Sequence, residues 1–284
     1  MAIENKPDAR MPELAYGSAR FLESADARAL RILAEYFDPL AHFRKAGVQH
    51  TVVFFGSARI LSREAAVQNL RDLELLGKQD HAPGLEANIK RARMSVHMSR
   101  YYEEARELSR LITEWARKHS RHPCFLVVCS GGGPGIMEAA NRGAHEAGGT
   151  SIGLSIQLPH EQRPNPYITP ELNFCFHYFF MRKLWFAQMA KALIVFPGGF
   201  GTMDELWEML TLLQTGKLSS HHLILIYGRR YWDQVLNWKA MLRWGTISAK
   251  EYKLLQFADT VDEAFDRLRE DLKFHDSSAK VSWG

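Results

Sequence analysis

Short, nearly continuous apolar runs alternate along the chain with longer segments in which apolar residues recur every three or four positions. Six of the short runs are predicted to be β-strands, at residues 51–56, 124–130, 151–156, 173–179, 192–196 and 222–227. Uninterrupted apolar runs are typical of strands that are covered on both faces, and the helical patterns between them supply the covering layers. The pattern therefore predicts an α/β fold, with a doubly wound, mainly parallel sheet and helices on both faces.

Two helical segments lie outside this alternation. Residues 23–46 have helical periodicity, with Ser24 or Asp26 as a possible cap, and Pro39 should kink or divide the helix. More than sixty residues separate the first two strands, which exceeds what one crossover helix needs, so about 60–100 is predicted to be a helical insertion. We therefore expect an N-terminal helical extension over 1–50, one α/β domain over 51–275 and a C-terminal tail over 276–284.

Composition and charge narrow the possible partners. The chain has 284 residues, of which 46% are hydrophobic and 24% charged, with a formal net charge of +4. These values are ordinary for a globular protein, and the basic residues are spread out rather than clustered, so we expect anionic small molecules and no nucleic acid as partners. No apolar run reaches transmembrane length and the N-terminus lacks the apolar core of a secretory signal, so we expect a cytoplasmic protein with no membrane partner.

The three cysteines, Cys124, Cys129 and Cys175, lie in apolar segments without CxxC spacing. This arrangement argues against a disulfide framework or a zinc site, and we expect buried, reduced thiols.

Three glycine-rich loops follow predicted strands, with the sequences GSAR at 56–59, SGGGPGIMEAANRGA at 130–144 and PGGFGTMDE at 197–205. A loop at the carboxyl end of a parallel strand that opens a helix presents free backbone N–H groups and the positive end of the helix dipole, which suits phosphate. Neither GxxxxGK[ST] nor GxGxxG is present, which disfavours a nucleoside triphosphatase or an ordinary dinucleotide enzyme. The candidate phosphate or substrate contacts in these loops are Gly56, Ser57, Arg59, Gly132, Gly133, Gly198, Gly199, Gly201 and Thr202.

These loops, together with MRK at 181–183, resemble the LOG family, once labelled lysine decarboxylase-like, over roughly residues 50–270. The resemblance implies a Rossmann-like, usually dimeric fold that hydrolyses the N-glycosidic bond of a nucleoside 5′-monophosphate, with a purine such as AMP favoured, to the free base and ribose 5-phosphate. No lysine is singled out for a pyridoxal phosphate Schiff base and no histidines form a metal-ligand set, so we expect no cofactor and no metal. The chain has Phe180 where short cytokinin-activating members have histidine, and Ala58 where their first loop has a second serine, so it is more similar to a longer bacterial branch.

Cleavage of an N-glycosidic bond builds positive charge on the ribose ring, and a carboxylate near the sugar would stabilise that charge. Glu205 is the candidate, on the first turn of a helix that we expect Thr202 to open, and the motif match favours its catalytic role. Asp204 is rotated from Glu205 by about 100° around a helix, so the two acids should not face the same ligand. For Asp204 we favour a role as a partner of the helix dipole.

Arg182 and Lys183 stand at the start of a helical segment, where cations run against the dipole preference, which hints at a ligand. With the resemblance, Arg182 is assigned a catalytic role, whereas Lys183 is either a substrate contact or a solvated cation. Glu138, inside the second glycine-rich motif, could equally bind a ribose hydroxyl or complement the helix dipole.

Two further expectations concern the whole protein. The segments 184–193 and 206–216 carry more large apolar residues than one sheet face should cover, and the resemblance implies a symmetric dimer, so we expect a homodimer or a larger even assembly. The alternative to an enzyme is a non-catalytic carrier or sensor of a nucleotide or a molybdopterin-type cofactor, because similar glycine loops can serve for binding alone. Glu205 together with Arg182 favours the enzyme.

Overall fold

The structure is a computed structural model that describes residues 11–79, 83–119, 124–159, 163–218 and 222–272. The first ten residues of the expected extension and the expected tail at 276–284 lie outside the described residues. Within the described part, one seven-stranded sheet has the order β4-β3-β2-β1-β5-β6-β7, and every pair of neighbouring strands is parallel. The strands are β1 His50–Phe55, β2 Leu126–Ser130, β3 Ser151–Ile156, β4 Asn173–Phe176, β5 Ala190–Val195, β6 Leu223–Tyr227 and β7 Leu255–Ala258.

The sheet has the expected doubly wound, Rossmann-like topology. From β1 the chain adds β2, β3 and β4 on one side, and then returns to add β5, β6 and β7 on the other. The ends of β1, β2 and β5 are level, because Phe54 pairs with Ser130 and Phe55 pairs with Val195. The loops that follow these three strands therefore meet at one edge, next to the switch point where α/β sheets bind ligands.

Helices cover both faces of the sheet, as the alternation predicts. Along β1, Val53 and Phe55 belong to one buried cluster and Val52 and Phe54 to the other, as the two-residue period of a strand requires. The first cluster includes residues of α2 Arg28–Ala46, α7 Phe179–Met189 and α8 Phe200–Gln214. The second includes residues of α5 Arg100–His119, α6 Ile136–Glu146 and α12 Val261–Asp271.

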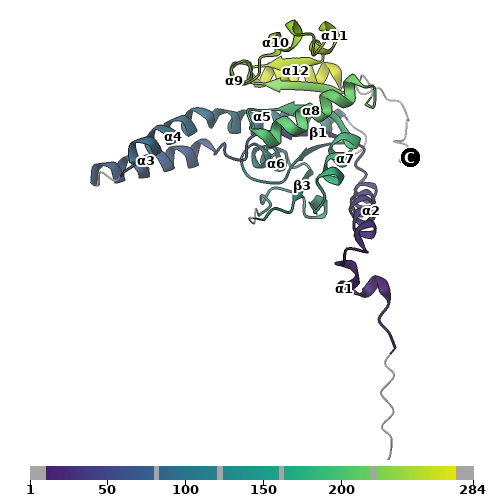
Figure 1. Ribbon diagram of the computed structural model, residues 1–284. Coiled ribbons are helices and arrows are strands. Elements are labelled where there is room, and N and C mark those ends of the chain that lie inside the picture. The colour runs from purple at the N-terminus through teal and green to yellow at the C-terminus, as the bar shows by residue number, and fades with distance from the viewer. Residues whose placement is uncertain (1–10, 80–82, 120–123, 160–162, 219–221, 273–284) are drawn as a thin grey trace, which may run out of the picture.

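The predicted insertion is a helical hairpin of α3 Arg63–Gln79 and α4 Leu85–Met98, which projects from the side of the domain (Figure 1). The crossover to β2 is then completed by α5. The remaining helices are short: η1 Ala15–Gly17, α1 Ala19–Leu22, η2 Pro170–Leu172, α9 Arg229–Val235, α10 Trp238–Arg243 and α11 Ala249–Tyr252. Among the described helices, none has the length and apolar character needed to cross a membrane.

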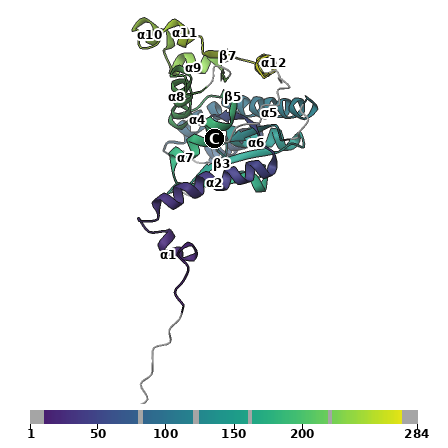
Figure 2. The same cartoon turned by 90° about the vertical axis from the view of Figure 1, so that its right-hand side faces the viewer.

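The N-terminal extension differs from its prediction at the start of its long helix. Helix α2 begins at Arg28 after Ala27, so neither Ser24 nor Asp26 caps it. Pro39 lies inside α2 and does not divide it, since the helix continues to Ala46. Figure 2 shows α2 lying along the domain beside α7, and the two helices are in contact.

The cysteines are free, as expected, but only one of them is buried. Cys129 is buried in a central strand and Cys124 is half-buried. Cys175 is exposed, which corrects our expectation, because β4 is an edge strand whose residues alternate between exposed and buried positions.

Candidate functional site

A cavity of about 630 Å³ lies where the three glycine-rich loops meet. Helices α7 and α8 contribute the rest of the predicted site to its wall. The predicted residues that line the cavity are Gly56, Ser57, Arg59, Gly132, Gly133, Arg182, Gly199, Gly201, Thr202 and Glu205. Glu138, Lys183 and Gly198, which we also predicted as substrate contacts, do not line it.

Backbone hydrogen bonds join the first loop to the other two. The N–H of Ser57 donates to the carbonyl oxygen of Pro197 at 3.0 Å, and the carbonyl oxygen of Ser57 accepts from the N–H of Ile136 at 3.2 Å. Gly56 lies so close to Ile136 that a Cβ at position 56 would come within 2.7 Å of that side chain. The small residue at 56 is therefore required for the loops to pack together, whatever ligand they hold.

The third loop opens α8 two residues earlier than predicted. The helix begins at Phe200 with Gly199 as its N-cap, so Thr202 is its third residue and Glu205 lies in its second turn. Thr202 is buried, and a Cβ at Gly198 would overlap its hydroxyl oxygen. Gly198 thus supports the site by letting Thr202 lie close to the loop, rather than by lining the cavity.

Glu205 and Arg182 form an ion pair at the cavity wall. An Nη of Arg182 donates to Oε1 of Glu205 at 3.1 Å, and their side chains are 14% and 4% exposed, respectively. Burial raises the pKa of the Glu205 carboxyl above its ordinary value, and the positive charges of Arg182 and Lys183 oppose this shift. The site therefore holds a carboxylate that burial has deprived of water, with one guanidinium as its partner.

Asp204 and Lys183 belong to a different cluster. The Asp204 side chain is 57% exposed, which confirms that the two neighbouring acids face different directions. The Nζ atom of Lys183 lies 2.9 Å from Oδ2 of Asp204 and 2.9 Å from Oε2 of Glu208. This ion-pair cluster joins α7 to α8 outside the cavity. Lys183 does not line the cavity, and because its side chain is only 17% exposed it is not a solvated cation either.

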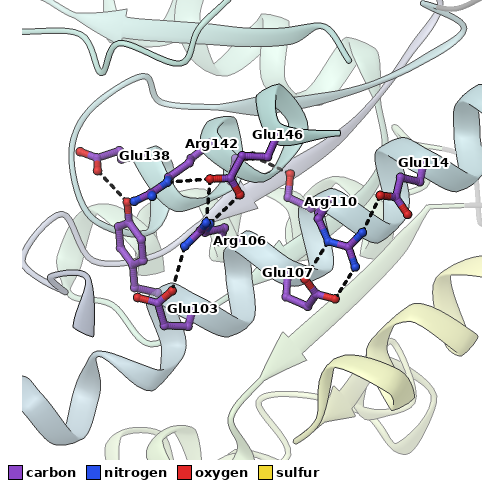
Figure 3. A network of polar contacts seen from close by, with 11 residues as sticks. Glu103, Arg106, Glu107, Arg110, Glu114, Glu138, Arg142 and Glu146 are labelled. Atoms are coloured by element: carbon purple, nitrogen blue, oxygen red, sulfur yellow. Dashed lines mark hydrogen bonds and ion pairs between the residues drawn. The ribbon is translucent and has the colours of Figure 1, made fainter. Parts of the chain in front are cut away.

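Glu138 contributes to the contact between α5 and α6. Its Oε1 accepts a hydrogen bond of 2.7 Å from the hydroxyl of Tyr102 on α5. Figure 3 shows this carboxylate at one end of a polar network in which Arg106 bridges Glu103 and Glu146. The network holds two helices together at the surface, where each ion pair adds little stability alone.

Sequence reasoning missed several residues of the site, because they lie outside the glycine motifs or carry apolar side chains. Arg163, Phe179 and Phe200 line the cavity, and Phe200 is 94% exposed. Asn165 is buried and supports the second loop: its Nδ2 donates to the carbonyl oxygens of Gly132 and Gly133 at 3.1 Å each. No local pattern marks Asn165, since these two glycines are more than thirty positions away.

The fold and site define a Rossmann-like α/β protein whose three glycine-rich loops enclose a cavity at the switch point. The sequence matches the family described as "Possible lysine decarboxylase" over residues 137–268. It is also similar to two proteins of Oryza sativa subsp. japonica that are named probable cytokinin riboside 5′-monophosphate phosphoribohydrolases. It is 28% identical to LOGL3 over 173 residues, 55% of this chain and 74% of that protein, and 30% identical to LOGL5 over 167 residues, 55% of this chain and 64% of that protein. These matches confirm the resemblance to the LOG family.

A solved structure is similar with lower identity. It is the molybdenum cofactor binding protein of the phototrophic bacterium Rippkaea orientalis, which is 18% identical, with a TM-score of 0.42, over 60% of this chain and 86% of that one.

Proposed function

We propose that the protein hydrolyses the N-glycosidic bond of a nucleoside 5′-monophosphate, with a purine nucleotide such as AMP as the favoured substrate. The products are the free base and ribose 5-phosphate. The observation that carries the proposal is the buried Glu205–Arg182 pair in the wall of a cavity formed by three glycine-rich loops. The names of the LOG relatives, which describe phosphoribohydrolases, support the same reaction.

The loops suit the 5′-phosphate. Backbone N–H groups at the start of α8 and the positive end of its dipole favour an anion, and the hydroxyls of Ser57 and Thr202 can add hydrogen bonds. Arg59, an exposed cation in the cavity wall, adds positive charge at the same edge. A nucleoside without the phosphate would lose these charge-assisted bonds together.

The base requires an apolar surface, and the same cavity provides one. Phe179, Phe200 and Leu158 line it, and aromatic rings offer a face on which any nucleobase can stack. A cavity with both kinds of lining suits a ligand that is anionic at one end and aromatic at the other.

In the reaction, the bond between C1′ and the base nitrogen breaks, and its electron pair leaves with the base. Water attacks C1′, and the proton that it loses ends on the departing base, so that atoms and charge balance. Between these events the ribose ring is cationic, and the carboxylate of Glu205 stabilises that charge. Arg182 holds Glu205 in place and can also contact the substrate from the cavity wall.

The test is to incubate the purified full chain with the common nucleoside monophosphates and with the matching nucleosides, and to separate the products by chromatography. We expect free base and ribose 5-phosphate from at least one monophosphate, and nearly none from the matching nucleoside. Comparable release of base from adenosine and AMP would contradict the phosphate site. A protein that binds a monophosphate tightly yet releases no base from any of them would be a carrier and not an enzyme.

A further inference from the structure

The N-terminal helix α2 is bonded to the start of α7, the helix that carries Arg182. The carboxylate of Glu35 on α2 accepts hydrogen bonds from the backbone N–H groups of His177 at 2.7 Å and Tyr178 at 3.3 Å. Tyr178 is the N-cap of α7, and its own side chain makes no capping hydrogen bond. Glu35 therefore fixes the backbone at the point where the chain enters α7.

A second contact of the same residue depends on the proline inside α2. Pro39 has no N–H, so the carbonyl oxygen of Glu35, four residues earlier, loses its usual helical partner. That oxygen accepts a hydrogen bond of 3.0 Å from Nε1 of Trp185, a fully buried residue of α7. The ring of Tyr36 stacks on the same indole, with centroids 5.5 Å apart. Hence the proline that the helix tolerates leaves an acceptor that binds α7.

These contacts bracket Arg182 along α7. Glu35 holds His177 and Tyr178 before it, and holds Trp185 three residues after it. The carbonyl oxygen of Tyr178 also accepts the backbone N–H of Arg182 at 3.3 Å. A short chain of hydrogen bonds thus runs from Glu35 through Tyr178 to the arginine that pairs with Glu205.

Electrostatics favours a carboxylate at this position. Arg182 and Lys183 are the fourth and fifth residues of α7, so two cations stand close to the positive end of the helix dipole. The negative charge of Glu35 lies at that end, on the backbone N–H groups of His177 and Tyr178, and offsets the positive end of the dipole. The two cations are paired with carboxylates of α8, so the dipole is what Glu35 compensates.

We propose that Glu35 is a positioning residue, through which α2 of the N-terminal extension sets the place of Arg182 in the site. The proposal rests on the function proposed above, since it assigns Glu35 a role in the same reaction. Glu35 does not line the cavity, so its effect has to pass through α7. A displacement of about 1 Å at a reacting group can cost up to a hundredfold in rate, which makes such positioning measurable.

A double-mutant cycle in the full-length protein tests this role. We expect Glu35→Ala to lower kcat for the best monophosphate about tenfold, and Glu35→Gln, which keeps one acceptor oxygen, to lower it less. In an Arg182→Ala background, Glu35→Ala should cause almost no further loss. Asp38→Asn, a change at an exposed carboxylate on the same helix, is the matched control and should leave kcat unchanged.

Two outcomes would overturn the proposal. One is a lower Tm with unchanged kcat in Glu35→Ala, and the other is an equal loss of activity in both the wild-type and the Arg182→Ala backgrounds. Either would reduce Glu35 to a structural contact between helices. If Glu35→Ala does not fold, the same cycle with Glu35→Gln decides.

Calorimetric titration with AMP separates this proposal from the proposed reaction. If the protein bound AMP but released no base from any of the common monophosphates, the hydrolase proposal would fail. The role of Glu35 would still predict that Glu35→Ala weakens AMP binding in the wild-type background and has no effect beside Arg182→Ala. Equal weakening in both backgrounds would contradict it.

Discussion

Glu205 is a carboxylate in a place that does not suit a carboxylate in the free protein. Its side chain is 4% exposed, its partner Arg182 offers one hydrogen bond of 3.1 Å, and burial raises its pKa. A carboxylate with so little solvation is stabilised strongly when a positive charge appears beside it. The ribose cation of the proposed reaction supplies that charge, so the feature that destabilises the free protein stabilises the transition state.

Replacing Glu205 with Gln keeps the shape and removes the charge. We expect turnover of the best monophosphate to fall by about 10² or more, the scale of losing a group that stabilises transition-state charge. The affinity for the nucleotide should change little or become tighter, because a carboxylate repels the phosphate in the ground state. Steady-state kinetics and calorimetry measure the two effects separately.

The neighbouring acid is a natural control, since Asp204→Asn removes an exposed carboxylate one position away. It should leave turnover nearly unchanged. An equal loss in the two variants would mean that Glu205 acts only as part of the general charge of the helix.

Glu205→Gln should also change how the stability of the protein depends on pH. Because the pKa of Glu205 is raised in the folded protein, the folded state keeps a proton at pH values where the unfolded chain has released it. Raising the pH through this interval therefore lowers the free energy of unfolding, and Glu205→Gln removes that loss. We expect the Tm of Glu205→Gln, relative to wild type, to rise as the pH is raised from about 4, as followed by circular dichroism. A difference that stays constant or shrinks as the pH rises would contradict the burial argument.

At the scale of elements, one motif glycine serves helix packing and not the ligand. Gly143 of GGGPGIMEAANRGA lies in α6, where a Cβ would overlap the carbonyl oxygen of Arg106 on α5. We expect Gly143→Ala to destabilise the protein, because backbone atoms have to move to admit the methyl group. Gly77→Ala on α3, where a Cβ would come no closer than 3.4 Å to the nearest side chain, is the control. It should be neutral or stabilising by up to about 1 kcal/mol, from helix propensity alone. Urea denaturation of both variants should show midpoints that shift in opposite directions or by clearly unequal amounts.

The elements that were predicted from the sequence are those with strong local signals. The six strands with long apolar runs are present, whereas β7 was missed, because Leu255–Ala258 is a four-residue edge strand that is only partly apolar. Pro39 was expected to kink or divide α2, and the helix is not divided. The carbonyl oxygen that proline leaves without its helical partner accepts a hydrogen bond from Trp185 of α7, which no local pattern could indicate. The start of α8 was misplaced at Thr202 because hydroxyl residues often cap helices, while here Gly199 occupies that position.

In the candidate site, too, the parts that could be predicted are those with strong local signals. The loops after β1, β2 and β5 could be placed together, because parallel strands end at one edge and glycine marks their turns. Arg163 and Asn165 could not be found in this way, since their place depends on how the connection between β3 and β4 folds back. Phe200 could not be found because an apolar side chain is not expected to remain exposed. Glu35 could not be found either, because the residues whose backbone N–H groups it binds lie more than 140 positions further along the chain.

At the scale of the whole molecule, the apolar surface that remains exposed is not where we expected it. Most large residues of segments 184–193 and 206–216 are buried or half-buried within the chain itself. Exposed large apolar residues are spread over several elements, and among them are Leu30, Leu33 and Phe37 on α2 and Phe180 and Leu184 near the start of α7. Residues three and four positions apart share one face of a helix, so those of α2 form a stripe, and α2 contacts α7.

An apolar stripe of this kind on a helix beside the site favours a partner, and we expect that partner to be a second copy of the chain. Light scattering at micromolar concentration should then give a mass about twice the 32.5 kDa of one chain, or a larger even multiple. Introducing charge by Leu33→Glu with Phe37→Glu should reduce the mass to that of a single chain, because two buried carboxylates would lack partners in the interface. Leu75→Glu with Leu76→Glu, at exposed apolar residues of α3, is the matched control and should leave the assembly intact. A wild-type mass near 32.5 kDa would contradict the assembly itself, and an even assembly that survives charge on α2 would place its interface on another face.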